Sequence, residues 1–214
     1  MKVLFVTDVH GSVRALSWVK KKAADYDSII VGGDLAKGGT KDFAAGFLRG
    51  AASGGAKVIF VHGNWDPADM TIPDGTIPLH SRTQMLGKFS VGGLGGSGPT
   101  PFKGPFEMGD DEARDVLARI GHVDILVSHS PPLMTKCDRA HSGHIGSLPV
   151  REYVQREGPS LVLSGHVHEG RAVDRLGAST VVNPGPLMEG KYAELLLDGI
   201  VSVELKSDPG IGGE

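Results

Sequence analysis

Five short apolar runs, each followed by side chains that can bind a metal ion, constrain the fold of this chain more than any other feature. The runs lie at residues 3–6, 29–31, 58–61, 125–127 and 161–163. The groups that follow them are Asp8-Val9-His10, Gly33-Asp34, Gly63-Asn64, Ser128-His129 and Gly165-His166-Val167-His168. Short apolar runs separated by segments of helical length predict βαβ units around a parallel sheet.

The regular elements can be placed from these runs and from the spacers between them. Strands are expected at 2–7, 27–32, 57–61, 123–128 and 160–164, and helices at 12–24, 40–53, 110–120 and near 148–157. The helix at 110–120 begins with Asp110, Asp111 and Glu112, which favour a first turn. Within 70–92, Pro73, Asp74-Gly75 and Pro78 interrupt what look like short strands.

The C-terminal part has a different, β-rich pattern. Its β-like runs lie at 171–176, 178–183, 191–197 and 200–205, with turns at Leu176-Gly177 and Asp198-Gly199. Because Asp-Gly between apolar runs indicates a hairpin, we expect an antiparallel continuation of the sheet and not a separate domain. We therefore predict one domain over residues 1–206 and a loose tail over 207–214, where Pro209 and three glycines follow Ser207.

Composition narrows the class of protein. A length of 214 residues suits one well-buried domain, and a net charge of −3 argues against polymeric nucleic acid or an anionic membrane as a partner. No apolar stretch approaches the roughly 20 residues of a membrane span, and the N-terminus lacks a signal-peptide pattern. The single cysteine, Cys137, cannot form an internal disulfide. A soluble cytoplasmic protein is expected; composition does not predict the oligomeric state.

The polar groups after the runs form a candidate metal site. Ligands of open α/β sheets bind beyond the carboxyl ends of the strands, where all of these side chains fall. Asp8 and His10 can reach one ion together, and Asp34 has oxygens enough to bridge two. Each piece alone is weak, since Asp-x-His and a lone loop histidine are common on surfaces. The mixed nitrogen and oxygen set suits Mn, Fe, Zn, Co or Ni better than calcium.

Taken in order, the five groups resemble the sequence blocks of the calcineurin-like metallophosphoesterase superfamily, and Asn183-Pro184-Gly185 extends the resemblance to about residue 185. The resemblance implies an α/β fold, a four-layer α/β/β/α sandwich of two mixed sheets, with two divalent ions, manganese among the candidates. It implies that Asp8, His10 and His168 hold one ion, that Asn64, His129 and His166 hold the other, and that Asp34 bridges them. It also places Asp34, Asn64 and His129 in the catalytic set.

Further loops strengthen the likeness to small single-domain prokaryotic phosphoesterases of this superfamily. They are Gly95-Gly96-Ser97-Gly98-Pro99-Thr100-Pro101-Phe102, Thr135-Lys136-Cys137-Asp138 and His141-x-x-His144-x-Gly146-Ser147. The resemblance implies that these loops border the metal cleft, where they either contact the substrate or only shape the cleft. His141 and His144 are therefore candidate substrate-binding residues. Arg139 and Arg171 could pair with a phosphate, although arginines are commonly solvated at the surface.

The third block departs from the superfamily pattern. Many members carry Gly-Asn-His-Asp or Gly-Asn-His-Glu there, with the histidine as proton donor, whereas this chain has Gly63-Asn64-Trp65-Asp66. An indole N–H can donate a hydrogen bond but cannot protonate a leaving group near neutral pH. General-acid catalysis typically contributes about 10²–10⁴-fold, so three consequences are open: a good leaving group, a substitute acid, or a reduced role for catalysis.

The substitution at position 65 raises questions about several residues. Substitute acids are His141, His144, His62 and His80. Trp65 could bind the substrate by stacking on a nucleobase or aryl ester, or could simply pack. Asp66 is expected to accept hydrogen bonds from the adjoining backbone.

The sequence thus predicts a binuclear metal-dependent phosphoesterase in which a metal-bridging hydroxide attacks a small phosphate ester, with nucleotide-like esters among the candidates. Some superfamily members with other residues at this position favour phosphodiesters over monoesters, so the resemblance points to a phosphodiesterase. A phosphomonoesterase and a catalytically weak, metal-stabilised scaffold protein are the alternatives. A nuclease acting on long polynucleotides is disfavoured by the acidic balance of charge.

Overall fold

Two six-stranded mixed sheets form the centre of the protein. The structure, a computed structural model, describes residues 1–36, 40–198 and 200–212. Sheet A contains, in spatial order, β14 (Ile200–Ser207), β13 (Lys191–Asp198), β1 (Lys2–Val6), β2 (Ser28–Val31), β3 (Lys57–Phe60) and β4 (Thr76–Pro78). Sheet B contains β11 (Ala172–Leu176), β12 (Ser179–Asn183), β10 (Leu161–Leu163), β7 (Ile125–Ser128), β6 (Phe89–Leu94) and β5 (Arg82–Leu86). The strands β1 to β4 are parallel, as are β12, β10, β7 and β6.

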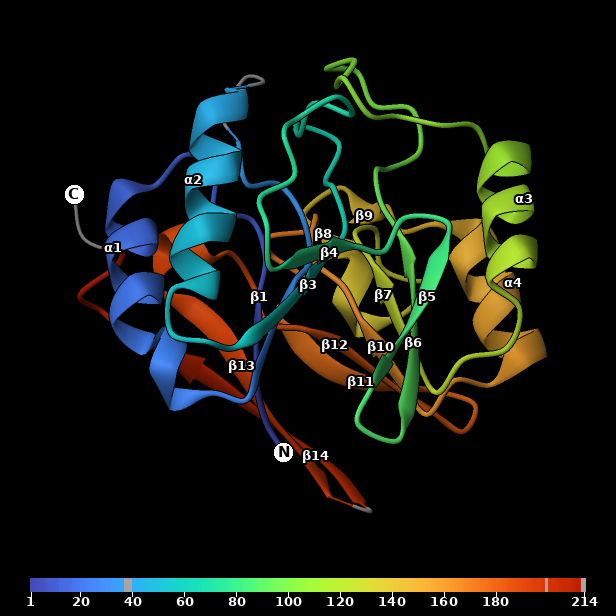
Figure 1. Ribbon diagram of the computed structural model, residues 1–214. Helices are drawn as coiled ribbons and strands as arrows, with labels where there is room; N and C mark the ends of the chain where they lie inside the picture. The colour runs from blue at the N-terminus through green and yellow to red at the C-terminus, as the bar shows by residue number, and fades with distance from the viewer. Residues whose placement is uncertain (37–39, 199, 213–214) are drawn as a thin grey trace.

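Helices cover the outer face of each sheet. Helices α1 (Val13–Lys22) and α2 (Lys41–Ala52) pack on sheet A, and α3 (Asp110–Ile120) and α4 (Leu148–Glu157) pack on sheet B (Figure 1). Short 3-10 turns lie at η1 (Ala23–Asp25), η2 (Lys136–Asp138) and η3 (Leu187–Glu189), and β8 (Arg139–Ala140) pairs with β9 (Gly143–His144). The four-layer α/β/β/α architecture is confirmed.

The apolar runs supply side chains to both faces of each sheet. In β1, Leu4 and Val6 point into the core beneath α1 and α2, while Val3 and Phe5 point into the core between the sheets. The same alternation holds in β7, where Leu126 packs toward α3 and α4. A strand buried on both faces needs apolar residues at every position, which explains why these runs are continuous.

Helix termini follow the local sequence closely. Ser147 caps α4 by accepting a hydrogen bond from the Val150 backbone N–H, and Gly158 ends it in the left-handed conformation. The acidic first turn of α3 begins where predicted. Both helices therefore span the predicted residues, whereas the predicted helix at 12–24 ends in the 3-10 turn η1.

The C-terminal strands are divided between the two sheets. Strands β11, β13 and β14 pair antiparallel with their neighbours, as predicted. The prediction is wrong for β12, which pairs parallel with β10 in sheet B. Of the predicted Asp198-Gly199 turn, Gly199 lies outside the described residues.

The segment after Ser207 packs against the body of the protein where a loose tail was expected. Ile211 is only 2 % exposed, in the core of sheet A and its helices. The Trp18 indole N–H donates to the Asp208 carboxylate at 2.9 Å. Residues 213–214 lie outside the described part. Among the described helices, none combines the length and apolar character that crossing a membrane requires.

Candidate metal centre

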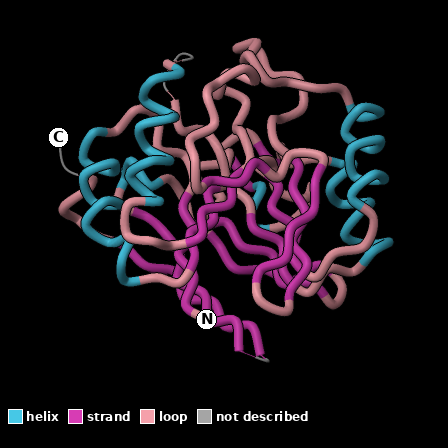
Figure 2. The backbone as a smooth tube through the Cα atoms, in the orientation of Figure 1, coloured by secondary structure: helices cyan, strands magenta, loops and turns pink. Residues whose placement is uncertain are grey.

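Five loops converge at one edge of the two sheets. The loops after β1, β2 and β3 leave sheet A, the loops after β7 and β10 leave sheet B, and connecting segments gather at this edge between the two helix pairs (Figure 2). These five loops carry all seven predicted ligands: Asp8, His10, Asp34, Asn64, His129, His166 and His168. The order of strands in two sheets thus brings together residues up to 160 positions apart.

Asp8, His10 and His168 form the first group of potential ligands. One donor atom from each lies within 4.8 Å of the others. The Nε2 atoms of His10 and His168 are 3.2 Å apart, and Asp8 Oδ1 lies 3.5 Å from His168 Nε2. The resemblance predicted this grouping.

Asp34, His129 and His166 form the second group, again with donor atoms within 4.8 Å of one another. Asn64 belongs beside it, because its Oδ1 lies 3.1 Å from His129 Nε2. Asp34 Oδ2 lies 3.4 Å from His129 Nε2 and 3.6 Å from His10 Nε2. Asp34 therefore stands between the two groups, in the position required of a bridging ligand.

The charges at this edge fit a pair of cations. Asp8 and Asp34 are buried, and within the described structure their ion-pairing partners are histidines only. Buried carboxylates need compensating positive charge, and two ring nitrogens facing each other at 3.2 Å need a proton or a cation between them. The mixed donor set suits divalent transition metals. The residues present therefore fit two divalent ions.

The histidines differ in their affinity for protons. Burial alone would lower the pKa of His129, but the carboxylates of Asp34 and Asp8 raise it to about 9. Burial, together with neighbouring His129, lowers the pKa of His166 to about 4. Burial also lowers the pKa of His10. His10 and His166 are thus neutral and ready to bind a metal near pH 7.

The backbone is strained at this edge. Asp8, His10, Asp34 and His166 have φ angles of 55°, 45°, 53° and 66°, in the left-handed region that side chains with a Cβ rarely adopt. Each such residue costs about 1–3 kcal/mol, and such strain gathers at functional sites. Hydrogen bonds hold the conformation: the N–H groups of Val9 and His10 both donate to the Asp34 carbonyl, at 2.8 and 2.9 Å.

Two glycines permit the close approach of the loops. A Cβ on Gly63 would lie 2.0 Å from Asp34 Oδ1, and a Cβ on Gly165 would lie 2.0 Å from Thr7 Oγ1. Any other residue would push these loops apart. The glycines that precede Asn64 and His166 are therefore required by contact between neighbouring loops.

Buried polar side chains orient the loops. The carboxylate of Asp66 accepts hydrogen bonds from the N–H groups of Gly63 and Ala36, both at 2.8 Å, which confirms the expected backbone role. Asn183 donates to the carbonyls of Val167 at 2.8 Å and Cys137 at 3.0 Å, so it holds the loop that carries His166 and His168. Sequence reasoning missed this role, although an amide at the end of an apolar run, before Pro-Gly, was its signal.

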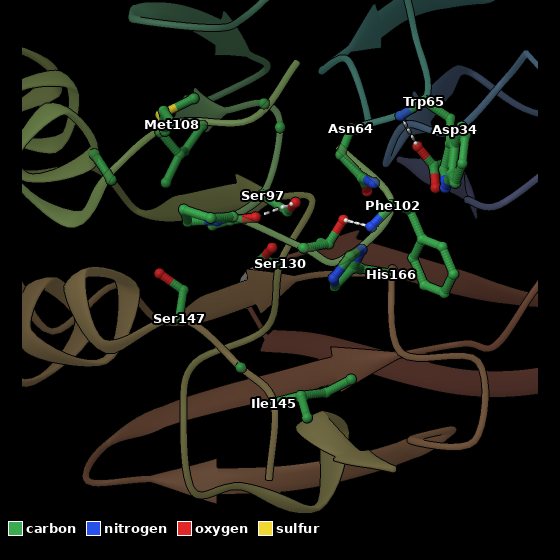
Figure 3. A pocket seen from close by; sticks show the side chains of 18 of the residues that line it. Asp34, Asn64, Trp65, Ser97, Phe102, Met108, Ser130, Ile145, Ser147 and His166 are labelled. Atoms are coloured by element: carbon green, nitrogen blue, oxygen red, sulfur yellow. Dashed lines mark hydrogen bonds between the residues drawn. The ribbon is translucent and has the colours of Figure 1, made fainter. Parts of the chain in front are cut away.

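A cleft of about 530 Å³ opens beside the donors (Figure 3). His10, Asp34, Asn64, His166 and His168 line it, together with Trp65. Its other walls are formed by residues 94–102, the start of α3 and residues 145–148. Of the three candidate substrate-binding residues, Trp65 alone lines the cleft.

The four candidate acids lie outside the cleft lining. The side chain of His141 is 93 % exposed and lies 3.8 Å from Glu169. His144 Nδ1 lies 2.7 Å from the carboxylate of buried Asp138. His62 is buried, and neither of its ring nitrogens has a hydrogen-bond partner in the described structure. His80 Nδ1 accepts from the Gly95 N–H at 3.1 Å.

The two arginines considered for phosphate binding lie outside the cleft lining as well. The Arg171 guanidinium donates to the carbonyls of Pro184 and Lys206, at 3.0 and 3.1 Å. Arg139 is exposed in β8. Neither arginine is therefore placed to pair with a phosphate bound in the cleft.

Comparison with known proteins agrees with this geometry. The model of the calcineurin-like phosphoesterase family matches residues 1–170. An uncharacterized protein of Methanocaldococcus jannaschii is 29 % identical over 197 residues, which cover 87 % of this chain and 88 % of the relative. The crystal structure of TT1561 from Thermus thermophilus matches with a TM-score of 0.74 and 23 % identity, over 96 % of this chain and 98 % of that one. Purple acid phosphatase PPD1 from yellow lupin seeds matches at a TM-score of 0.60 and 12 % identity, over 100 % of this chain and 52 % of that one. The two structural matches concern the fold alone.

Proposed function

Because this chain belongs to the calcineurin-like phosphoesterase family and is therefore a metal-dependent phosphoesterase, we propose that its preferred substrates are small phosphate diesters. The observation that carries the proposal is a pair of donor groups, joined by Asp34, beside which Trp65 stands where a proton donor is expected. Two divalent ions, with Mn, Fe, Zn, Ni or Co as candidates, supply a water nucleophile and positive charge when bound.

The residues of the cleft favour a diester by their charge. A diester carries one negative charge where a monoester near neutral pH carries close to two. No lysine or arginine is found among the described residues that line the cleft. Beyond the positive charge that the two ions would supply, the second charge of a monoester would find no cationic side chain among these residues.

The missing acid points the same way. Trp65 lies beside Asn64, and its backbone N–H donates to Asp34 Oδ1 at 2.9 Å, so the residue holds a proposed ligand in place. Its indole cannot give a proton to a leaving oxygen. We expect the leaving group of the substrate to depart as a stabilised oxyanion, such as an aryl oxide or a second phosphate ester of low basicity.

The test compares two substrates on one reconstituted protein. Metal-free protein is loaded with Mn²⁺, Ni²⁺ or Co²⁺ and assayed with bis(p-nitrophenyl) phosphate and with p-nitrophenyl phosphate, followed by a panel of cyclic nucleotides. We expect a higher kcat/KM for the diester and a loss of at least about 100-fold in Asn64→Ala and His129→Ala. Unchanged activity in both variants would overturn the site, and a monoester preference would overturn the diester assignment.

A binding or scaffold role is the second candidate, and the indole at position 65 is the observation that favours it. A scaffold needs the metal centre only for stability. Full metal occupancy without hydrolysis of any ester in the panel would support this role.

A further inference from the structure

We infer that the cleft binds an uncharged aromatic substituent of the substrate, an aryl group or a nucleobase, against the side chains of Trp65 and Phe102. We call these two residues the aromatic pair. The inference deepens the proposed function and rests on it, because it assigns the part of the ester that does not react.

The size of the cleft calls for such a substituent. Pockets that hold whole small molecules have volumes of about 300–1,000 Å³. At about 530 Å³, this cleft has room for much more than a phosphate group beside the metal donors. A further part of the substrate must fill the space toward α3 and α4.

The charge of the cleft disfavours a polyanionic substituent. In the described part of the chain, the ionisable residues that line the cleft are the histidines His10, His166 and His168 and the carboxylates Asp34 and Asp110. The nearest guanidinium to Asp110, that of Arg114, lies 4.0 Å away and also contacts Asp111 and Glu152. A triphosphate or an oligonucleotide would place further negative charges beside Asp110, and the described residues that line the cleft include no lysine or arginine to meet them.

The walls of the cleft are mainly apolar. The side chains of Leu94, Met108, Ala113, Ile145 and Leu148 line it beyond the metal donors. Four hydroxyls lie among them, on Ser97, Thr100, Ser130 and Ser147. Such a surface suits a flat apolar ring with a few polar edges.

The aromatic pair lies directly beside the metal donors. The ring centroids of Trp65 and Phe102 are 6.2 Å apart, with 40° between the ring planes. Figure 3 shows both side chains at the end of the cleft that holds Asp34, Asn64 and His166. A substituent attached to a phosphate at the donors would therefore meet these rings first.

Phe102 is 73 % exposed, yet its loop is firmly attached. The Glu107 carboxylate accepts hydrogen bonds from the N–H groups of Thr100 and Gly104, at 3.0 and 2.7 Å. The Phe106 N–H donates to the Asn64 carbonyl at 3.2 Å, which ties the loop to a proposed metal ligand. The phenyl ring is therefore held beside the proposed metal donors, where a bound substrate can reach it.

The test measures binding of two phosphonates that differ only in the ring. Metal-loaded protein is titrated with phenylphosphonate and with methylphosphonate, neither of which is an ester, while tryptophan fluorescence is recorded. Trp18 is 9 % exposed and bonded to Asp208, so the signal should come from Trp65 and disappear in Trp65→Phe. We expect phenylphosphonate to bind about tenfold more tightly, in keeping with stacking on aromatic side chains.

Variants of Phe102 decide the outcome. Phe102→Ala should bring the two affinities within twofold of each other, and Phe102→Tyr should keep the preference. Leu196→Ala, which removes a side chain 54 % exposed on β13, is the matched control and should change neither affinity. Equal binding of the two phosphonates, or a preference that survives Phe102→Ala, would overturn the inference.

The two proposals fail separately. Diester hydrolysis without a phenyl preference would reject the aromatic contact and leave the phosphodiesterase intact. A phenyl preference without hydrolysis of any diester would reject the phosphodiesterase and leave the aromatic contact intact.

Discussion

Metal binding should release protons from this protein, and the number can be worked out from the surroundings of His129. The ring is fully buried, with Nδ1 2.8 Å from the Gly32 carbonyl and Nε2 3.1 Å from Asn64 Oδ1. Both nitrogens face oxygen acceptors, so the metal-free ring carries two protons, in agreement with a pKa raised to about 9. A cation can take Nε2 only when its proton leaves.

The other histidines limit the number of protons that metal binding releases. The pKa of His166 is about 4 and that of His10 is lowered, so neither holds an extra proton near pH 7. Burial lowers the pKa of His168, but its hydrogen bond to Asp8 and the charges of Asp8, Asp34 and Glu189 together outweigh burial and raise it, so His168 can add a second proton. Each proton changes the logarithm of the apparent association constant by about one per pH unit. Between pH 6 and 8 the affinity should therefore rise by about 10²–10⁴-fold.

Calorimetry measures this number directly. Mn²⁺ is titrated into metal-free protein at pH 7 in two buffers that differ in their enthalpy of ionisation, and the difference in heat counts the protons. We expect one to two protons for the loaded site. His129→Gln should reduce the number by one, whereas His122→Gln, which alters an exposed histidine outside the site, should leave it unchanged. Zero protons would show that the metal-free His129 is neutral, and three or more would show that at least one further group, His10, His166 or a metal-bound water, also loses a proton.

Three further predictions concern stability and loop packing. Burial lowers the pKa of His62 to about 4, so the unfolded chain takes up a proton between pH 6.5 and 4 that the folded chain does not. The free energy of unfolding should therefore fall across this window by up to about 3 kcal/mol because of this residue. In denaturant unfolding, His62→Leu should lose less stability between pH 6.5 and 4 than the unaltered protein, and an equal loss would refute the assignment. Gly165→Ala should weaken metal binding by at least about tenfold in calorimetry, because its Cβ would lie 2.0 Å from Thr7 Oγ1, while Gly46→Ala, with open space around its Cβ, should not. Ile211→Ala should lower the free energy of unfolding by about 2–4 kcal/mol in urea, since the side chain is 2 % exposed; a loose tail would give no change.

Most of the fold could be predicted because its signals are local. A strand covered on both faces must be apolar throughout, and Ser147 and Gly158 mark the ends of α4 within a few residues of the helix itself. The neighbour with which a strand pairs could not be predicted from local sequence. Nothing within 179–183 indicates that β12 should pair parallel with β10, since that choice depends on strands elsewhere in the chain. Ile211 was missed for the same reason, because Trp18 and Asp208 meet across 190 positions.

The candidate site also has residues that local sequence predicts and residues that it does not. Seven donors could be predicted because each directly follows a strand, and parallel strands deliver their carboxyl ends to one edge. The positions of His141 and His144 could not, because they depend on the small β8–β9 pair and on buried Asp138. Asn183 acts through backbone carbonyls of two other loops, a relation that no local pattern records.

The division of donors between the two sheets determines when a complete donor group can form during synthesis of the chain. The first group joins Asp8 and His10 of sheet A to His168, and the second joins Asp34 to His129 and His166 of sheet B. During synthesis the chain therefore has no complete group until residue 166 has emerged and the two sheets have met. Metal binding to a complete group would therefore stabilise the contact between the two sheets.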